Sequence, residues 1–199
     1  MTTIMSTAAN RREVSHERIV GVASRAIRRA GYRGVGVADI MKEAGLTHGG
    51  FYAHFASRDV LMVEATERAG RENQAALSAA IERRVAKGSS RFAALVAAYL
   101  HDVHLDSSEE GCVVAALASE MARQDEAVRD EARRRVAALV NLVVSALPAS
   151  AAAARADVIA ATMVGALQLA RTLGGKAGRD LLAQTRKSLL EQHDPSIPA

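Results

Sequence analysis

Two histidines near the middle of this 199-residue sequence are the first candidates for chemistry. His101 and His104 lie three residues apart, so on a helix both rings would share one face, as the ligands of a zinc ion do. A third ligand would have to come from Glu109 or Glu110. A histidine pair beside a loop is more often a solvated helix end than a metal site. We therefore predict neither a metal nor a cofactor.

The single cysteine, Cys112, is the second candidate. It follows Gly111 at the start of an expected helix, where the helix dipole favours a reactive thiolate. The chain has no second cysteine to resolve an oxidised sulfur or to form an internal disulfide. We favour a small apolar residue packed beside Val113 and Val114. The alternative is a thiol sensor that responds to oxidants or electrophiles.

Sequence patterns typical of enzymes are missing from the chain. There is no nucleophile elbow, zincin helix, phosphate loop or dinucleotide fingerprint, and Gly174-Gly175 has the character of a helix break. No apolar run approaches the length of a membrane span, and the N-terminus lacks the apolar core of a secretory signal. We predict a cytoplasmic protein that is not an enzyme.

A short polar and aromatic stretch near position 50 is the third candidate, and its chemistry would be the recognition of DNA. Residues 48–50, His-Gly-Gly, are small and polar, which suits a helix that enters a major groove about 12 Å wide. Phe51 and Phe55 lie four residues apart and would anchor this helix inward. Tyr52 and His54 would then point outward, toward phosphates or base edges.

Positive charge is concentrated at the same end of the chain. Residues 1–60 hold nine Lys and Arg against five Asp and Glu, whereas the remaining residues hold 17 of each. The whole net charge of +4 therefore lies in the first third. A basic end on a neutral body is typical of a protein that contacts nucleic acid or an anionic surface. A solvated basic helix face is the alternative.

The spacing of apolar residues predicts helices and no strand, so the expected fold class is all-α. Gly31 and Gly45 would end the first two helices, and Ser57 would cap the fourth. Residues 1–14 are polar and lack periodicity, so we expect a flexible N-terminal arm there. The expected helices, about nine in total, are 15–30, 37–44, 48–55, 57–85, 91–104, 111–123, 126–147, 151–173 and 179–193.

The first three helices, with Gly45 in the turn between the second and third, form a helix-turn-helix pattern. Here the sequence resembles the TetR family of bacterial one-component transcriptional regulators. The resemblance rests on Ala30-Gly31-Tyr32, on residues 38–47 (ADIMKEAGLT) and on residues 49–61 (GGFYAHFASRDVL). It implies a helix-turn-helix DNA-binding domain at residues 15–62 and a larger helical effector-binding and dimerisation domain at residues 63–199.

The resemblance also implies which residues contact DNA. Tyr52, His54 and Arg58 match positions that hold backbone phosphates, and Thr47 opens the recognition helix. The sequence departs from the family pattern at Gly36, where hydroxyl residues are usual, so a phosphate contact is lost there. The expected contacts across the helix-turn-helix at 39–58 and its flank are Gly36, Val37, Lys42, Thr47, His48, Gly49, Gly50, Tyr52, His54 and Arg58.

The remaining neutral, apolar helices are expected to form a homodimer and a ligand pocket. A dimer would bury a stripe on the last two helices as an isologous four-helix bundle. The residues of this stripe are Ile159, Met163, Ala166, Leu167, Ala170, Leu181, Leu182 and Leu189. The pocket would be lined by Leu95, Tyr99, Val114, Leu117, Glu120, Met121 and Gln168, which suggests a small, mostly apolar inducer.

From these expectations we predict a dimeric repressor that dissociates from a palindromic double-stranded DNA operator when it binds its inducer. The long helix 57–85 joins the two parts and would act as a lever, with Gly70 either as a flexing point or as a site of close packing. An architectural DNA binder is the rival interpretation. It would have no need of about 130 further residues of apolar helix.

Overall fold

The structure is a computed structural model that describes residues 2–148 and 152–194. Within these ranges it contains nine α-helices, one short 3₁₀ helix called η1, and no strand, so the expected all-α class is confirmed. The elements are α1 (Thr2–Ala30), α2 (Val37–Glu43), η1 (His48–Ala53), α3 (Arg58–Val85), α4 (Arg91–Tyr99), α5 (Val103–Asp106), α6 (Val113–Met121), α7 (Glu126–Ala146), α8 (Ala152–Leu173) and α9 (Gly175–His193).

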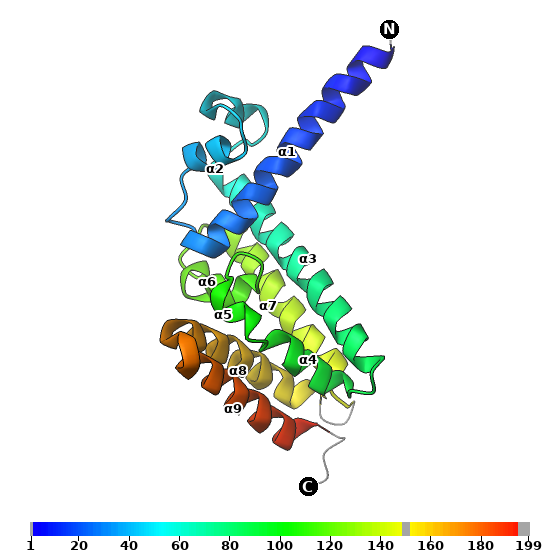
Figure 1. Cartoon of the computed structure of the whole chain (residues 1–199). Helices are drawn as coiled ribbons and strands as arrows, with labels where there is room; N and C mark the ends of the chain where they lie inside the picture. Colours follow the sequence, from blue (N-terminus) through cyan, green and yellow to red (C-terminus); the bar gives the residue numbers. More distant parts are fainter. Residues whose placement is uncertain (1, 149–151, 195–199) are drawn as a thin grey trace.

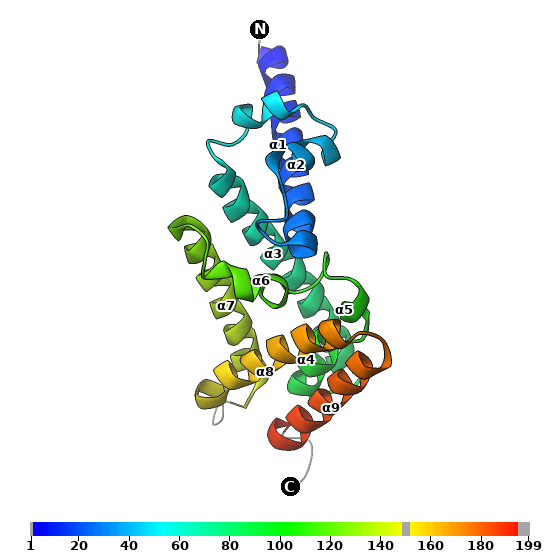
Figure 2. The same cartoon turned by 90° about the vertical axis from the view of Figure 1, so that its left-hand side faces the viewer.

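The molecule is elongated, with the DNA-reading candidates at one end and the C-terminal helices at the other (Figure 1). The first helix, α1, lies beside α2 and η1 at the upper end, and α3 runs from there down into the body. The helices α4 to α9 make up the body. Figure 2 shows α8 and α9 side by side across its lower part, and the two helices are in contact.

The N-terminal helix is longer than expected. It begins at Thr2 and not at Ser15, so residues 2–14 of the expected flexible arm 1–14 are helical; residue 1 lies outside the described residues. The segment contains no proline or glycine to stop a helix. In addition, Arg12 donates a hydrogen bond of 2.5 Å to the carbonyl of Ala53 at the end of η1, which ties this part of α1 to the DNA-reading end.

The turn of the helix-turn-helix and the start of α3 lie where the sequence predicted them. Gly45 adopts a φ of +69° after α2, and the N–H of Leu46 donates to the carbonyl of Met41 at 2.8 Å, which closes the turn. Ser57 caps α3 through its hydroxyl, which accepts a hydrogen bond of 3.3 Å from the N–H of Val60. The expected DNA-reading helix 48–55 is shorter, because η1 ends at Ala53.

In the body, the helix boundaries differ from those expected from the sequence in two places. The expected helix 91–104 breaks at Leu100 into α4 and α5, and α9 begins at Gly175, four residues before the expected start. The single connection between α8 and α9 is Gly174, whose φ of +65° allows the sharp reversal. The expected start of the eighth helix at residue 151 lies outside the described residues.

One segment is more apolar than we expected from the sequence. Residues Arg155–Leu173 of α8 are long enough and apolar enough to cross a membrane by length and composition. In the structure this helix packs against α6, α7 and α9, and 39% of its most apolar window is buried. A core helix of a soluble bundle has the same composition, so the segment is weak evidence for a membrane span.

Gly70 lies where α3 packs against α7. A Cβ atom at this position would be 2.3 Å from Cδ of Arg135, whose guanidinium forms an ion pair of 2.7 Å with the buried carboxylate of Glu131. The missing side chain therefore makes room for Arg135. Of the two roles considered for Gly70, the structure supports close packing between the lever and α7.

Candidate nucleic-acid interface

The start of η1 forms the exposed tip of the helix-turn-helix. Thr47, His48 and Gly49 are all exposed there, and a Cβ at Gly49 would meet no atom within 4 Å. The side chain of Thr47 makes no capping hydrogen bond to η1. Next to this tip, 75% of Tyr52 is exposed, and its ring stands edge-on to Phe51 at 5.2 Å. The tip therefore carries exposed hydroxyl and imidazole groups that could form hydrogen bonds in a DNA groove.

Buried rings hold η1 against α1. Phe51 and Phe55 are buried, as their spacing predicted. Their rings stack with centroids 5.5 Å apart, and His16 of α1 stacks on Phe55 at 4.5 Å. The other side of His16 is fixed by a contact of 2.6 Å between its Nε2 atom and the carboxylate of Glu64 in α3. Contacts with α1 and α3 therefore fix the orientation of a very short helix, which local hydrogen bonds alone would not hold.

His54 lies deeper than the sequence suggested. Its ring is half-buried near His16, with 6.1 Å between centroids, and its Nδ1 atom is buried without a hydrogen-bond partner among the described residues. Burial, and then the nearby His16 and Arg12, lower the pKa of His54. The expectation that His54 points freely outward is therefore corrected: it packs against α1 and lies at the edge of the exposed tip.

Arg58 is engaged inside the protein. Its guanidinium donates a hydrogen bond to the backbone carbonyl of Tyr32, so it joins the start of α3 to the loop after α1. The side chain is half-buried. This hydrogen bond gives Arg58 a positioning role within the helix-turn-helix, and its expected phosphate contact stays a prediction.

The other expected DNA contacts lie at the start of α2, along α2 and in η1. Gly36 is the exposed N-cap residue of α2 and makes no side-chain cap, and Val37 behind it is half-buried. Lys42 is exposed on the same helix, whereas Gly50 is half-buried, with 3.7 Å between a Cβ placed on it and the terminal carbon of Met41. Lys42 therefore adds positive charge to the exposed surface, and a Cβ at Gly50 would make only an ordinary van der Waals contact with α2.

A contact between the DNA-reading end and the body was missed by the sequence reasoning. The carboxylate of Glu120 in α6 accepts a hydrogen bond of 3.0 Å from the N–H of Tyr32, whereas we had placed Glu120 in the ligand pocket. Nearby, the buried guanidinium of Arg28 donates to the carbonyl of Gly111 at 3.4 Å and to Glu72 at 3.1 Å. Both ends of α6 thus contact the helix-turn-helix.

Two family models match separate parts of the chain, the first reaching into the start of α3 and the second beginning after its end. Residues 19–65 match the model described as "Bacterial regulatory proteins, tetR family", and residues 88–178 match "Transcriptional regulator LmrA/YxaF-like, C-terminal domain". The chain belongs to the TetR family. It is thus a DNA-binding transcriptional regulator with a helix-turn-helix, and the TetR family is one of regulators and not of enzymes.

Several solved structures share this fold over nearly their whole length. NemR of E. coli in its reduced form is 18% identical with a TM-score of 0.76, and the match covers 92% of this chain and 99% of NemR. A TetR-family regulator from Agrobacterium tumefaciens is 24% identical (TM-score 0.73, coverage 92% and 98%), and one from Chloroflexus aurantiacus J-10-FL is 20% identical (TM-score 0.73, coverage 92% and 98%). Comparison with curated proteins gives no match.

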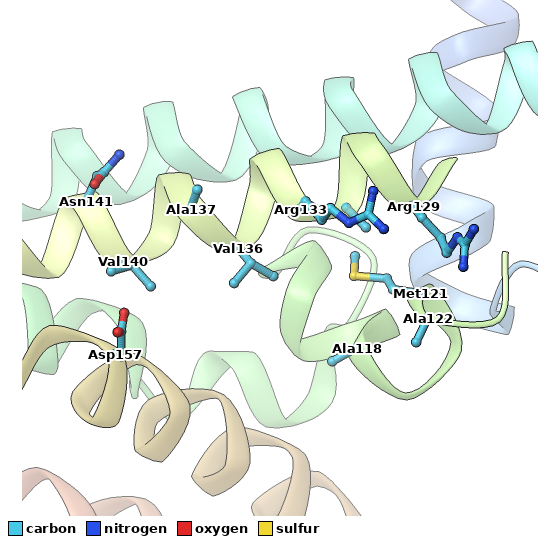
Figure 3. Close-up of a pocket in the computed structure, with 11 residues that line it drawn as sticks. Ala118, Met121, Ala122, Arg129, Arg133, Val136, Ala137, Val140, Asn141 and Asp157 are labelled. Carbon is cyan, nitrogen blue, oxygen red and sulfur yellow. The ribbon is translucent and has the colours of Figure 1, made fainter. Parts of the chain in front are cut away.

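The body contains a groove of about 660 Å³ between α6, α7 and the start of α8. We call it the α6–α7 groove; Figure 3 shows Val136 and Val140 of α7 lining it opposite Met121 of α6. Arg129, Arg133, Asn141 and Asp157 add polar groups, and the remaining lining residues are Ala118, Ala122, Ala132 and Ala137. Its lining is mostly apolar.

The residues of this groove are mostly different from those predicted. Of the predicted set only Met121 lines it. Leu95 and Leu117 are fully buried core residues, and Val114 is buried on the other side of α6. Tyr99 lies in a separate cavity, and the remaining two, Glu120 and Gln168, line neither cavity. Helix periodicity finds the apolar side chains but does not separate those that fill the core from those that border a void.

The predicted dimer stripe is corrected in the same way. Seven of its eight members are buried within the single chain, namely Ile159, Met163, Ala166, Leu167, Ala170, Leu182 and Leu189, whereas Leu181 is half-exposed. Side chains that are already buried have no surface left to give to a second chain. The outward face of α8 carries Val158, Leu169 and Leu173 instead, which are 67%, 60% and 58% exposed.

The other candidates lie in the body. Cys112 is buried as the N-cap residue of α6 and packs beside Val113 and Val114. His101 is exposed, and its Nδ1 atom accepts a hydrogen bond of 3.2 Å from the N–H of Val103. In the described part of the chain, no three His, Cys, Asp or Glu residues gather closely enough to hold a metal ion.

Proposed function

We propose that this TetR-family protein is a repressor that acts in the cytoplasm and binds a palindromic operator as a homodimer. The observation that carries the proposal is the exposed start of η1, where Thr47, His48 and Gly49 project beside the exposed ring of Tyr52. Hydroxyl, imidazole and phenol groups supply hydrogen bonds to phosphates and base edges. The helix-turn-helix unit of this proposal ends near residue 62, and the effector and dimerisation unit follows it.

A selection of DNA fragments tests the operator. The full chain is incubated with a random-sequence duplex library, and bound fragments are sequenced after several rounds. We expect enrichment of a two-fold symmetric sequence with half-sites about one helical turn, or 34–36 Å, apart. A library that stays random after selection would leave only non-specific DNA binding and would contradict the repressor proposal.

The dimer in this proposal forms through the outward faces of α8 and α9. A groove of about 430 Å³ runs between the two helices, lined by Val158, Thr162, Leu181, Thr185 and Ser188 among others. Together with the exposed Leu169 and Leu173, it forms a mixed polar and apolar surface that a second copy related by a two-fold axis would cover.

Sedimentation velocity at micromolar concentration measures this dimer. Leu169→Glu places a charge in the centre of the outward face and should yield monomers, whereas Gln74→Glu, on the exposed side of α3, should remain dimeric. A monomeric wild type would contradict the dimer. A Leu169→Glu dimer of unchanged stability would show that the interface is not on this face.

The inducer in this proposal is a small, mostly apolar molecule in the α6–α7 groove. The α6 helix supplies Met121 to the groove and Glu120 to Tyr32, so a ligand that displaces α6 acts directly on a contact to the helix-turn-helix. To weaken operator binding a hundredfold, the ligand must favour the released state by only about 2.7 kcal/mol.

Release from the selected operator tests this site. A panel of small apolar compounds is screened for release, and each active compound is repeated on Val136→Trp, which fills the groove, and on the exposed Ala79→Trp of α3 as control. We expect Val136→Trp to lose the response and Ala79→Trp to keep it. Equal responses from both variants would place the inducer elsewhere.

A further inference from the structure

One end of the α6–α7 groove carries a carboxylate whose charge no described side chain neutralises. Asp157 lines the groove from the second turn of α8, and it is exposed. Figure 3 shows its carboxylate directed from α8 toward Val140 of α7. Within residues 2–148 and 152–194, no Lys, Arg or His forms an ion pair with Asp157. A cation in the groove would therefore meet this carboxylate without displacing a partner that the protein supplies.

Arg155 is the cation nearest to Asp157 in the sequence, and it lies on another side of α8. Residues two apart on a helix do not face each other, and Arg155 is not among the residues that line the groove. Burial, and then the charge of Arg155, lower the pKa of His193 at the end of α9. The charge of Arg155 therefore acts toward α9, and the groove side of Asp157 has no compensating charge.

Two arginines also line the groove, and acidic residues of α7 form ion pairs with both. Glu126 pairs with Arg129 and, at 2.9 Å, with Arg133, and Asp130 forms a second ion pair with Arg133. In Figure 3 both arginines lie toward the end of α7 that is away from Asp157. Two arginines and two carboxylates sum to no net charge, so the uncompensated charge of the groove is negative and lies at one end.

The wall between these two ends is apolar. Val136, Val140 and Met121 line it together with four alanines, and its volume of about 660 Å³ is within the range of small-molecule sites. Because 43% of Val136 is exposed, a hydrocarbon chain in the groove would cover apolar surface that water now contacts. Asn141, which lines the same end as Val140, is uncharged, and its amide oxygen can accept a hydrogen bond.

We infer that the α6–α7 groove selects amphipathic ammonium cations, an inference that rests on the proposed inducer site and names the class of its ligand. The ammonium group lies beside the carboxylate of Asp157, and the hydrocarbon part lies against Val140 and Val136. A neutral molecule of the same shape covers the same apolar surface but leaves Asp157 unpaired, and an anion brings a like charge to it. Asp157 therefore discriminates among molecules that the apolar wall would bind equally.

Isothermal titration calorimetry without DNA measures this selection. The probes are octylammonium, octanol and octanoate at neutral pH, which share one hydrocarbon chain and differ in charge. We expect saturable binding of octylammonium below millimolar concentration, about fivefold tighter than that of octanol, as an exposed ion pair provides. Octanoate should bind most weakly.

Three results of this titration would overturn the inference. The first is a lack of saturable octylammonium binding, and the second is equal affinity for octylammonium and octanol. The third is tighter binding of octanoate. That result would assign the groove to anions held by Arg129, whose buried Nε atom has no hydrogen-bond partner among the described residues.

Three variants locate the selection. Asp157→Asn keeps the shape of an exposed side chain and removes its charge, so it should fold normally and bind octylammonium and octanol equally. Asp106→Asn removes an exposed carboxylate of α5 outside the groove and should keep the wild-type preference. Val136→Trp, which fills the groove, should lose binding of all three probes. A preference for octylammonium that survives in Asp157→Asn would overturn the assignment.

Release from the selected operator separates this inference from the inducer proposal. If octylammonium binds through Asp157 and leaves operator affinity unchanged, the charge selection stands and the inducer role of the groove fails. If neutral compounds release the operator as strongly as ammonium compounds of the same shape, the inducer role stands and the charge selection is overturned.

Discussion

The carboxylate of Glu120 accepts a hydrogen bond of 3.0 Å from the backbone N–H of Tyr32 and thereby joins the last turn of α6 to the loop after α1. Gly31, just before this N–H, has a φ of +78°, and a Cβ there would lie 2.2 Å from Oε1 of Glu120. The glycine therefore serves both the turn and the close approach of the carboxylate. The contact thus joins α6, the helix that supplies Met121 to the α6–α7 groove, to the helix-turn-helix.

Replacing Glu120 by alanine should uncouple the two parts. We expect Glu120→Ala to lower the free energy of unfolding by about 1 kcal/mol, because a half-exposed hydrogen bond to a charged group is lost. The larger effect should be on release, with the inducer weakening operator binding by less than in the wild type. Fluorescence anisotropy with labelled operator reads this out, and the exposed Ser119→Ala on the same helix is the control. An unchanged inducer response in Glu120→Ala would remove this contact from the mechanism.

Gly70→Ala should destabilise the protein through Arg135. The new methyl group would lie 2.3 Å from Cδ of Arg135, so the arginine must move away from Glu131, at a cost of about 1–3 kcal/mol. A double-mutant cycle with Arg135→Ala, followed by chemical denaturation, isolates the clash. The alanine should cost much less in the Arg135→Ala background. A cost that is the same in both backgrounds would argue against the packing role and for a role in helix bending.

The fold was largely predictable from the sequence because helix ends carry local signals. Gly45 and Ser57 are examples in which a single residue determines where a turn or a helix begins, through φ or through a hydroxyl cap. Neither signal needs knowledge of the distant chain. The N-terminal extension of α1 was missed because polarity was read as disorder, although residues 2–14 contain no helix breaker.

The site was predictable only in part, because contacts between distant segments leave no local signal. Thr47 and Tyr52 lie where the motif placed them, on the exposed tip. Arg58 and Glu120, in contrast, bind the carbonyl and the N–H of the same residue, Tyr32, 26 and 88 positions away in sequence. An apolar stripe likewise does not reveal whether its own chain or a second copy covers it, so Met163 was misassigned to the dimer interface.

Variants of Arg58 and Lys42 should have different effects, one on folding stability and the other on DNA affinity. Arg58→Ala removes the hydrogen bond to Tyr32 and should lower the free energy of unfolding by about 1 kcal/mol. Lys42 is exposed, so Lys42→Ala should leave unfolding unchanged and reduce the slope of log affinity against log salt by about 0.9. Thermal unfolding and salt titrations of operator binding measure the two effects. If Lys42→Ala leaves the salt slope of the wild type intact, Lys42 does not contact phosphate.

Stability should fall on mild acidification. Burial lowers the pKa values of His54, His104 and His193 below their ordinary value of 6.5 in the folded protein. The unfolded chain therefore binds these protons more readily, so their contribution is fully present above pH 6.5 and is lost as the pH falls through and below it.

Calorimetry between pH 8 and pH 5 measures this loss as a falling melting temperature. His104→Gln should flatten the decline, whereas the exposed His101→Gln should leave it unchanged. If the two variants have the same pH profile as the wild type, burial of His104 does not set the acid sensitivity.

We infer that the exposed tip of η1 recognises a specific operator sequence. The most direct measurement is the dissociation constant for the selected duplex and for a scrambled duplex of equal length and composition, at one salt concentration, with wild type and Tyr52→Ala. We predict that wild type binds the selected duplex about 10³-fold or more tightly than the scrambled one. Tyr52→Ala should unfold at the wild-type temperature, because the ring is 75% exposed, and should bind the selected duplex about tenfold more weakly. Equal wild-type affinity for the two duplexes would contradict the account.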